Sequence, residues 1–137
     1  MPQITQGAQQ HLEKEGVANR CQIVGGDMFA EWPFKADLYL ISRVLENWSD
    51  EQAIAILKNC RKAMDPDSKV ALVERILPED KDRALLFFLF DLQMLVGPGG
   101  QDHTLEEYQS FFKAANLSFT RAIPLSPPFS LIEAVGA

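Results

Sequence analysis

A strand, helix and second strand in succession limit the possible folds of this chain more than any other feature. Residues Ala36–Val44 form a nearly continuous run of apolar and β-favouring side chains, as in a central strand of a parallel sheet. Ser49 and Gln52 follow with the spacing of a capping box, which predicts a helix that begins at Asp50. A second apolar run, Lys69–Leu77, is expected to be the next strand. This order predicts two parallel strands joined by a right-handed helical crossover, and therefore an α/β fold.

Further elements are expected on both sides of this unit. A helix is predicted over Thr5–Glu15, followed by a short strand over Cys21–Val24 that ends at two glycines. Beyond the unit, Leu85–Val96 has apolar residues on all sides of a helix. Such a helix must be buried by more than one neighbour or by a partner chain.

The last part of the chain predicts one more helix and a strand pair. Thr104 and Glu107 form a second capping box, and the helix that it opens is expected to close near Asn116. Two short β-prone runs, Ser118–Ile123 and Ser130–Val135, are close enough in sequence to pair antiparallel.

The composition is typical of one soluble domain, which we assign to residues 1–137. A net charge of -6 and a pI near 4.8, without clusters of Lys and Arg, argue against nucleic-acid binding. The start of the chain lacks the pattern of a signal peptide. The most apolar stretch, Ala84–Val96, is shorter than the ~20 residues that cross a bilayer. We therefore expect a cytoplasmic protein that does not bind membranes.

The cysteines and histidines do not form a recognisable site. Cys21 and Cys60 lack the spacing of a zinc site or a disulfide framework. His11 and His103 are far apart and have no neighbouring ligands in the sequence. We expect two reduced cysteines and no metal.

Several motifs in order carry a resemblance to a known family. They read GGDMF, LYLISRVLENWSDEQAIAILKNCRKAM, VALVERILPED, FDLQMLVGPGGQDHTLEEYQSFFKAANL and SLIEA. From about Pro2 to Ala134 the chain resembles the carboxyl-terminal half of the S-adenosylmethionine-dependent O-methyltransferases related to the hydroxyindole, caffeate and bacterial polyketide enzymes. The resemblance implies a partial Rossmann-like methyltransferase fold: a mostly parallel sheet that ends in an antiparallel hairpin and lacks the family's first two strands. It also implies that the glycine-rich cofactor loop, the ribose-binding acid and the family's amino-terminal helical domain are missing.

The resemblance implies a cofactor site for S-adenosylmethionine at three residues. Asp27 and Met28 match the family's adenine-contacting pair, in which the carboxylate accepts from the exocyclic amine and the thioether packs on the ring. We count Ser42 with them as cofactor-binding. Without the resemblance, Asp27 would be interpreted as the cap of a turn after two glycines.

The resemblance also identifies three candidate catalytic acids. Glu46 occupies the position of the family's catalytic His, and a Glu is a much weaker base than a His unless burial raises its pKa. Alternatively, Glu46 is a solvated loop acid. Glu74 and Asp102 match the two family acids that orient this His. With Glu46 in place of the His, this orienting role would be lost, or the negative charges of the acids would repel one another. If the three acids converge on one pocket, the pKa of at least one should rise.

Two residues of the expected 85–96 helix, Phe90 and Met94, resemble positions that line the family's acceptor pocket. Met and Phe at helical spacing are equally well explained as core residues. The identity of the acceptor cannot be inferred from them.

Two functions follow from these observations. The first is methyl transfer from S-adenosylmethionine to a hydroxyl of a small aromatic or polyketide-like acceptor, impaired in this chain because the glycine-rich loop is absent. The second is a non-catalytic remnant that acts as a self-associating module. In it Asp37–Val44 has an unpaired edge, which predicts a homodimer or a higher assembly.

Overall fold

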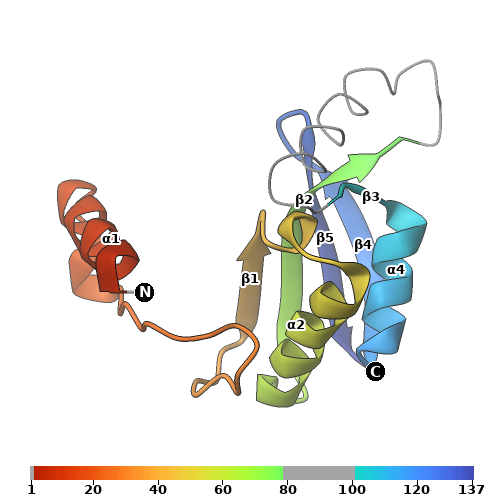
Figure 1. Ribbon diagram of the computed structural model, residues 1–137, viewed down its shortest axis with the longest axis horizontal. Helices are drawn as coiled ribbons and strands as arrows, with labels where there is room; N and C mark the ends of the chain where they lie inside the picture. The colour runs from red at the N-terminus through yellow and green to blue at the C-terminus, as the bar shows by residue number, and fades with distance from the viewer. Residues whose placement is uncertain (1, 79–100) are drawn as a thin grey trace.

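A mixed β-sheet forms the centre of the fold, in a computed structural model that describes residues 2–78 and 101–137 (Figure 1). Its four main strands lie in the order β1 (Leu38–Ser42), β2 (Lys69–Leu77), β5 (Phe129–Gly136) and β4 (Leu117–Pro124). A two-residue strand, β3 (His103–Thr104), pairs with the end of β2.

The pairing of the strands confirms the predicted fold class. β1 and β2 are parallel, with Leu38 opposite Lys69, and helix α2 (Asp50–Ala63) connects them. β3 is also parallel to β2. β5 runs antiparallel to β2 and forms an antiparallel hairpin with β4. The sheet is therefore a parallel crossover unit extended by the expected carboxyl-terminal hairpin.

Both predicted capping boxes are present. The Ser49 hydroxyl accepts from the Gln52 amide, and the Gln52 side chain accepts from the Ser49 amide, at the start of α2. Thr104 and Glu107 make the same exchange at the start of α4 (Leu105–Ala114). Such caps satisfy amide groups that the first helical turn leaves without partners.

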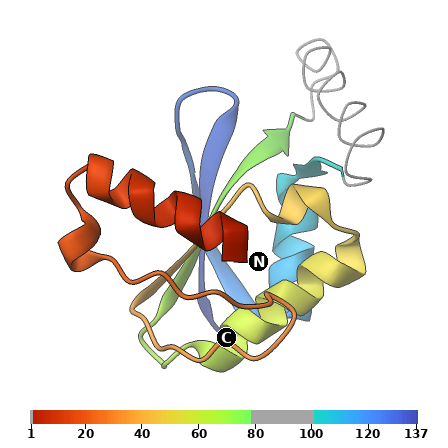
Figure 2. The ribbon, with the colours of Figure 1, turned by 60° about the vertical axis from the view of Figure 1, so that its left-hand side comes forward.

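Helices α2 and α4 pack against one face of the sheet, and Figures 1 and 2 show them together on that side. The core between them and the sheet includes these fully buried side chains: Leu45, Ile56, Leu57, Val70, Leu72, Tyr108, Phe112 and Ile132. On the opposite face, Leu38 and Leu40 of β1 remain exposed.

The amino-terminal part of the chain lies apart from this core. Helix α1 (Pro2–Lys14) forms where a helix was predicted, and Gly16, with a φ of 70°, follows its end. A 3-10 helix, η1 (Ala18–Arg20), comes next. In Figure 1, α1 stands well away from β1. Among the described residues, β1 is therefore an edge strand, as expected.

One predicted strand is wrong. Cys21–Val24 has an irregular backbone in the structure, and Val24 is exposed. A strand requires a neighbour that completes its hydrogen-bond ladder, and no described strand lies beside this segment. The predicted helix over 85–96, with Phe90 and Met94, lies outside the described residues.

Candidate active site

The three candidate catalytic acids come together around one arginine. Glu46 lies in the 3-10 helix η2 (Leu45–Asn47), just after β1, and Glu74 lies near the carboxyl end of β2. Asp102 immediately precedes β3. All three are buried, as is Arg75, the residue after Glu74. Parallel pairing places the ends of β1 and β2 at the same edge of the sheet, which explains why these side chains meet.

Arg75 bridges two of the acids. Its Nη2 lies 3.0 Å from Oε2 of Glu46. Its Nε donates to the Asp102 carboxylate, at 3.0 Å from Oδ1 and 2.9 Å from Oδ2. Burial is the largest single influence on the pKa of Arg75 and by itself would lower it. The hydrogen bond to Asp102 and the negative charges of Asp102, Glu46 and Glu74 together outweigh burial, so the pKa is raised. Sequence reasoning missed this residue.

Glu46 is held between two guanidinium groups. The residue is only 1% exposed, so the interpretation of Glu46 as a solvated loop acid is wrong. Besides the contact of Oε2 with Arg75, its Oε1 accepts from Nε of Arg43 at 3.3 Å. The expected repulsion among the acids is therefore compensated by arginine.

Glu74 holds the backbone that leads to η2. Its Oε1 accepts from the amides of Val44 and Leu45, each at 3.0 Å. Its Oε2 is buried and has no hydrogen-bond partner among the described residues. Burial is the main cause that raises the pKa of Glu74 to about 7; the two backbone amides oppose this rise, and the charges of Glu46 and Asp102 contribute to it. The expected rise in pKa thus occurs, with desolvation as its main cause.

Arg43 marks the point where the chain leaves β1. Its φ of 54° lies in the left-handed region, which costs a non-glycine residue roughly 1 kcal/mol. Its amide donates to the Val73 carbonyl at 2.9 Å, and its guanidinium lies 5.5 Å from the centre of the Phe129 ring. These contacts and the one to Glu46 offset the strain.

Two contacts tie the cluster to the surrounding helices. The Tyr108 hydroxyl of α4 donates to the Arg75 carbonyl at 3.3 Å. Burial, followed by the nearby acids, raises the pKa of Tyr108. The buried ring of His103 places Nε2 3.1 Å from Oδ1 of Asp50, which joins β3 to the first turn of α2.

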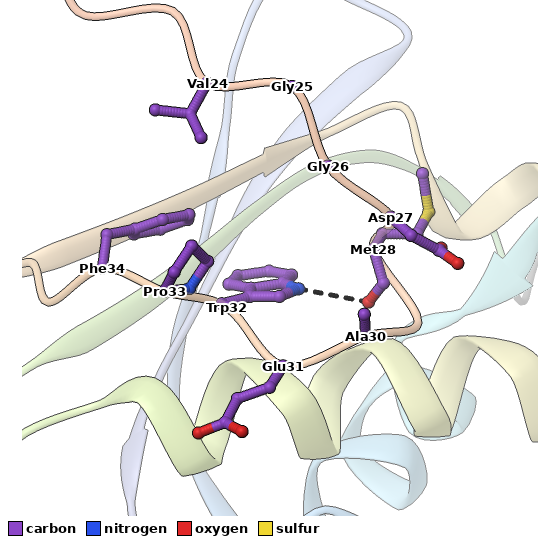
Figure 3. A pocket seen from close by; sticks show the side chains of 10 residues that line it. All are labelled: Val24, Gly25, Gly26, Asp27, Met28, Ala30, Glu31, Trp32, Pro33 and Phe34. Atoms are coloured by element: carbon purple, nitrogen blue, oxygen red, sulfur yellow. Dashed lines mark hydrogen bonds between the residues drawn. The ribbon is translucent and has the colours of Figure 1, made fainter.

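The predicted cofactor-binding residues lie elsewhere, near two open pockets beside β1. The first, of about 330 Å³, is lined by residues 24–28 and 30–34 (Figure 3). Asp27 caps a turn there, since its Oδ1 accepts from the Phe29 amide at 3.0 Å. The Met28 carbonyl accepts from Nε1 of Trp32 and from Nδ2 of Asn59 on α2. These bonds fix the loop while the Met28 side chain stays partly exposed.

The second pocket, of about 410 Å³, brings two of the predicted residues together. Met28 and Ser42 both line it, with these other residues: Trp32, Leu40, Ile41, Val44 and Ile56. Met28 is thus shared by the two pockets, whereas Asp27 lines only the first. Glu46, Glu74 and Asp102 line neither pocket.

Within residues 2–78 and 101–137, the His, Cys, Asp and Glu side chains form no group of three or more that could hold a metal ion. No helix in those ranges has the length and apolar character to cross a membrane.

Comparison with known proteins identifies the family. Residues 1–118 match the family model described as the O-methyltransferase domain. The chain is 39% identical over 133 residues to the phenazine O-methyltransferase PhzM of Lysobacter antibioticus. The matched region covers 97% of this chain and 39% of that protein. It superposes on the crystal structure of LaPhzM with a TM-score of 0.92 and 37% identity, over 100% of this chain and 41% of that one.

A further solved relative contains ligands. The O-methyltransferase NcsB1, in complex with S-adenosylhomocysteine and 1,4-dihydroxy-2-naphthoic acid, matches with a TM-score of 0.84 and 28% identity, over 97% of this chain and 39% of that one. This chain spans about two fifths of the length of these relatives. The family model and the similarity to PhzM show that the chain belongs to the O-methyltransferase domain family.

Proposed function

We propose that this chain is the carboxyl-terminal part of an S-adenosylmethionine-dependent O-methyltransferase catalytic domain. The reaction moves the methyl group from the sulfonium of the cofactor to a hydroxyl oxygen of a small aromatic or polyketide-like acceptor. The carbon–sulfur bond breaks as the new carbon–oxygen bond forms, S-adenosylhomocysteine leaves, and the proton of the acceptor hydroxyl passes to water. Family membership supports this proposal, and NcsB1 was solved with that product and a dihydroxynaphthoic acid.

The pocket shared by Met28 and Ser42 is the observation that carries the cofactor assignment. It opens beside the carboxyl end of β1, where ligands gather in α/β sheets. The thioether of Met28 is partly exposed and can pack on an adenine ring. Asp27 lies next to it on the same loop, with its carboxylate exposed.

We assign Glu46 a structural role rather than a role in proton transfer. Both oxygens of Glu46 face guanidinium groups, so this side chain is not free to receive the proton of an acceptor hydroxyl. Methyl transfer in such a site depends on holding the acceptor oxygen close to the methyl group. The resemblance places the glycine-rich cofactor loop outside this chain, and we propose that the chain alone binds the cofactor weakly and does not turn over.

A self-associating, non-catalytic module is the second candidate, supported by the edge of β1 that no described strand covers. The exposed fractions of Leu38 and Leu40 are 53% and 60%. An apolar edge strand without a neighbour is a template for pairing, so we propose a homodimer or higher assembly. We also propose a cytoplasmic location, because the exposed Cys21 and the buried Cys60 are both free thiols.

Calorimetry with S-adenosylhomocysteine and an assay for methyl transfer to 1,4-dihydroxy-2-naphthoic acid test the impairment. We expect a dissociation constant weaker than about 100 µM, equivalent to about 5.5 kcal/mol of binding free energy, and no turnover. Micromolar affinity or measurable turnover by the chain alone would contradict the proposed impairment.

A further inference from the structure

A short turn carries two of the residues proposed for cofactor binding, Asp27 and Met28. In this turn, residues 27–30, the Ala30 amide donates to the Asp27 carbonyl at 3.1 Å, and the Phe29 amide donates to Oδ1 of Asp27 at 3.0 Å. None of the helices and strands in the described part of the chain includes the turn. Its place in the fold therefore depends on the contacts that it makes with other elements.

The side-chain amide of Asn59, on α2, donates to two successive carbonyls of the 27–30 turn. Its Nδ2 lies 3.3 Å from the Met28 oxygen and 2.8 Å from the Phe29 oxygen. An amide NH2 group carries two hydrogens, so both bonds form at the same time. Asn59 and Met28 are 31 positions apart in the sequence, and these bonds join the turn to a helix whose own start is fixed by a capping box.

The Met28 carbonyl receives a second hydrogen bond from within its own loop. Nε1 of Trp32 donates to it at 3.1 Å, as Figure 3 shows. A carbonyl oxygen has two lone pairs, and Asn59 and Trp32 together use both. The Met28 peptide group is therefore held in one orientation, which also fixes the direction in which the Met28 side chain leaves the backbone.

Two further observations place Asn59 beside the proposed cofactor pocket. Ile56 lines that pocket, and Asn59 lies three residues later, on the same face of α2. The Phe29 ring packs edge-on against the Trp48 ring, with 4.9 Å between the ring centres. Because Trp48 lies just before the cap of α2, both contacts hold the turn against this one helix.

We propose that Asn59 is a positioning residue for the cofactor site: its amide ties the 27–30 turn to α2, so that Asp27 and Met28 present one fixed geometry to an adenine ring. This inference rests on the proposed function, because it assumes that S-adenosylmethionine binds at this turn. Asn59 lines neither of the two pockets and acts through the turn. A turn that is already in place does not have to be ordered by the ligand, and binding is stronger for that reason.

Hydrogen exchange measured by NMR tests the hold on the turn without any ligand. In Asn59→Leu, the amides of Phe29 and Ala30 should exchange with solvent about fivefold faster or more, since the two bonds that oppose opening of the turn are lost. The amide of Leu72 in the central strand β2 should be unaffected. Leu has a higher helix propensity than Asn, so unfolding in urea should shift little. Gln109→Leu, which removes an amide from an exposed position of α4, is the matched control and should leave the exchange of the turn unchanged.

The affinity for S-adenosylhomocysteine tests what this hold contributes to binding. In an NMR titration, Asn59→Leu should raise the dissociation constant about fivefold relative to wild type, because the ligand must then order the turn itself. Asn59→Asp has nearly the same shape, but its carboxylate cannot donate, so it should weaken binding at least as much. Asn59→Gln keeps an amide donor and should recover part of the affinity, which a role in helix stability alone does not predict. Gln109→Leu should bind as wild type does.

The outcomes separate this proposal from the proposed function. Unchanged exchange of Phe29 and Ala30 in Asn59→Leu overturns the proposal whether or not the chain binds the ligand. Faster exchange with an unchanged dissociation constant overturns it as well, because the turn is then held without any effect on the cofactor. If wild type shows no saturable binding at millimolar ligand, the cofactor assignment of the proposed function fails and the positioning role fails with it, whereas the exchange rates still show whether Asn59 holds the turn.

Discussion

At the scale of single residues, Arg75 decides whether the buried acids are tolerable. It is the cation that contacts both Glu46 and Asp102. Replacing Arg75 with Met would leave both carboxylates buried without the guanidinium charge. Removing one member of a buried ion pair typically lowers the free energy of unfolding by about 3–5 kcal/mol. We therefore expect Arg75→Met to lower the free energy of unfolding by that amount in urea titrations.

The matched control for this prediction is an arginine on the surface. Arg121 pairs with Glu133, but its side chain is 61% exposed, so Arg121→Met should cost about 1 kcal/mol or less. If the two variants lose similar stability, the cluster around Arg75 does not carry the energy assigned to it. Arg75→Lys, which keeps the charge but not the bridging geometry, should fall between them.

Glu74 predicts a particular pH dependence of stability. Its pKa rises on folding from 4.5 to about 7, so the folded state holds a proton that the unfolded state releases. The resulting stabilisation is complete below pH 4.5 and is lost as the pH rises through about 7. Because Glu74→Gln removes this titration but keeps a carbonyl oxygen for the two amides, its stability relative to wild type should rise by up to about 1.4 kcal/mol per pH unit in this window.

Glu133 provides a control of opposite sign. A hydrogen bond from Arg121 lowers the pKa of this carboxyl, so its contribution is present above the usual pKa and is lost as the pH falls through the lowered one. Glu133→Gln should therefore be most destabilising above pH 4.5 and show no gain toward pH 7. Equal pH profiles for wild type and Glu74→Gln would contradict the assigned pKa.

The sequence predicted the place of most site residues but not their environment. The end of the apolar run Lys69–Leu77 identifies Glu74, yet the adjacent Arg75 could equally have faced solvent. Its partner Asp102 is 27 residues away, and only the fold brings the two together. The pair of opposite charges inside an apolar strand was the available signal, since buried charges are paired.

At the scale of elements, prediction succeeded where local chemistry was sufficient. Each capping box is a motif of four residues, and both boxes correctly predicted where a helix begins. β2 has the predicted bounds Lys69–Leu77. The hairpin strands were also found, each extended by one residue at both ends. Cys21–Val24 failed because a strand depends on a neighbour, which its own four residues do not specify.

At the scale of the whole molecule, the described residues form a partial sheet that has one face covered by α2 and α4 and has β1 and β4 as its edge strands. The superposition on LaPhzM covers 100% of this chain and 41% of the LaPhzM chain, so the similarity concerns one part of a larger protein. The pocket proposed for the cofactor is lined in part by Leu40 and Ser42 of β1.

NMR of the Met28 methyl group during addition of S-adenosylhomocysteine tests whether this chain binds the cofactor at the pocket shared by Met28 and Ser42. Met64, buried in the core, is an internal control, and Met28→Leu assigns the signal. If this chain keeps the cofactor pocket of an O-methyltransferase, the Met28 signal moves in a saturable way while Met64 stays fixed. If neither signal moves at millimolar ligand, or if both signals move equally, the proposed cofactor pocket is wrong.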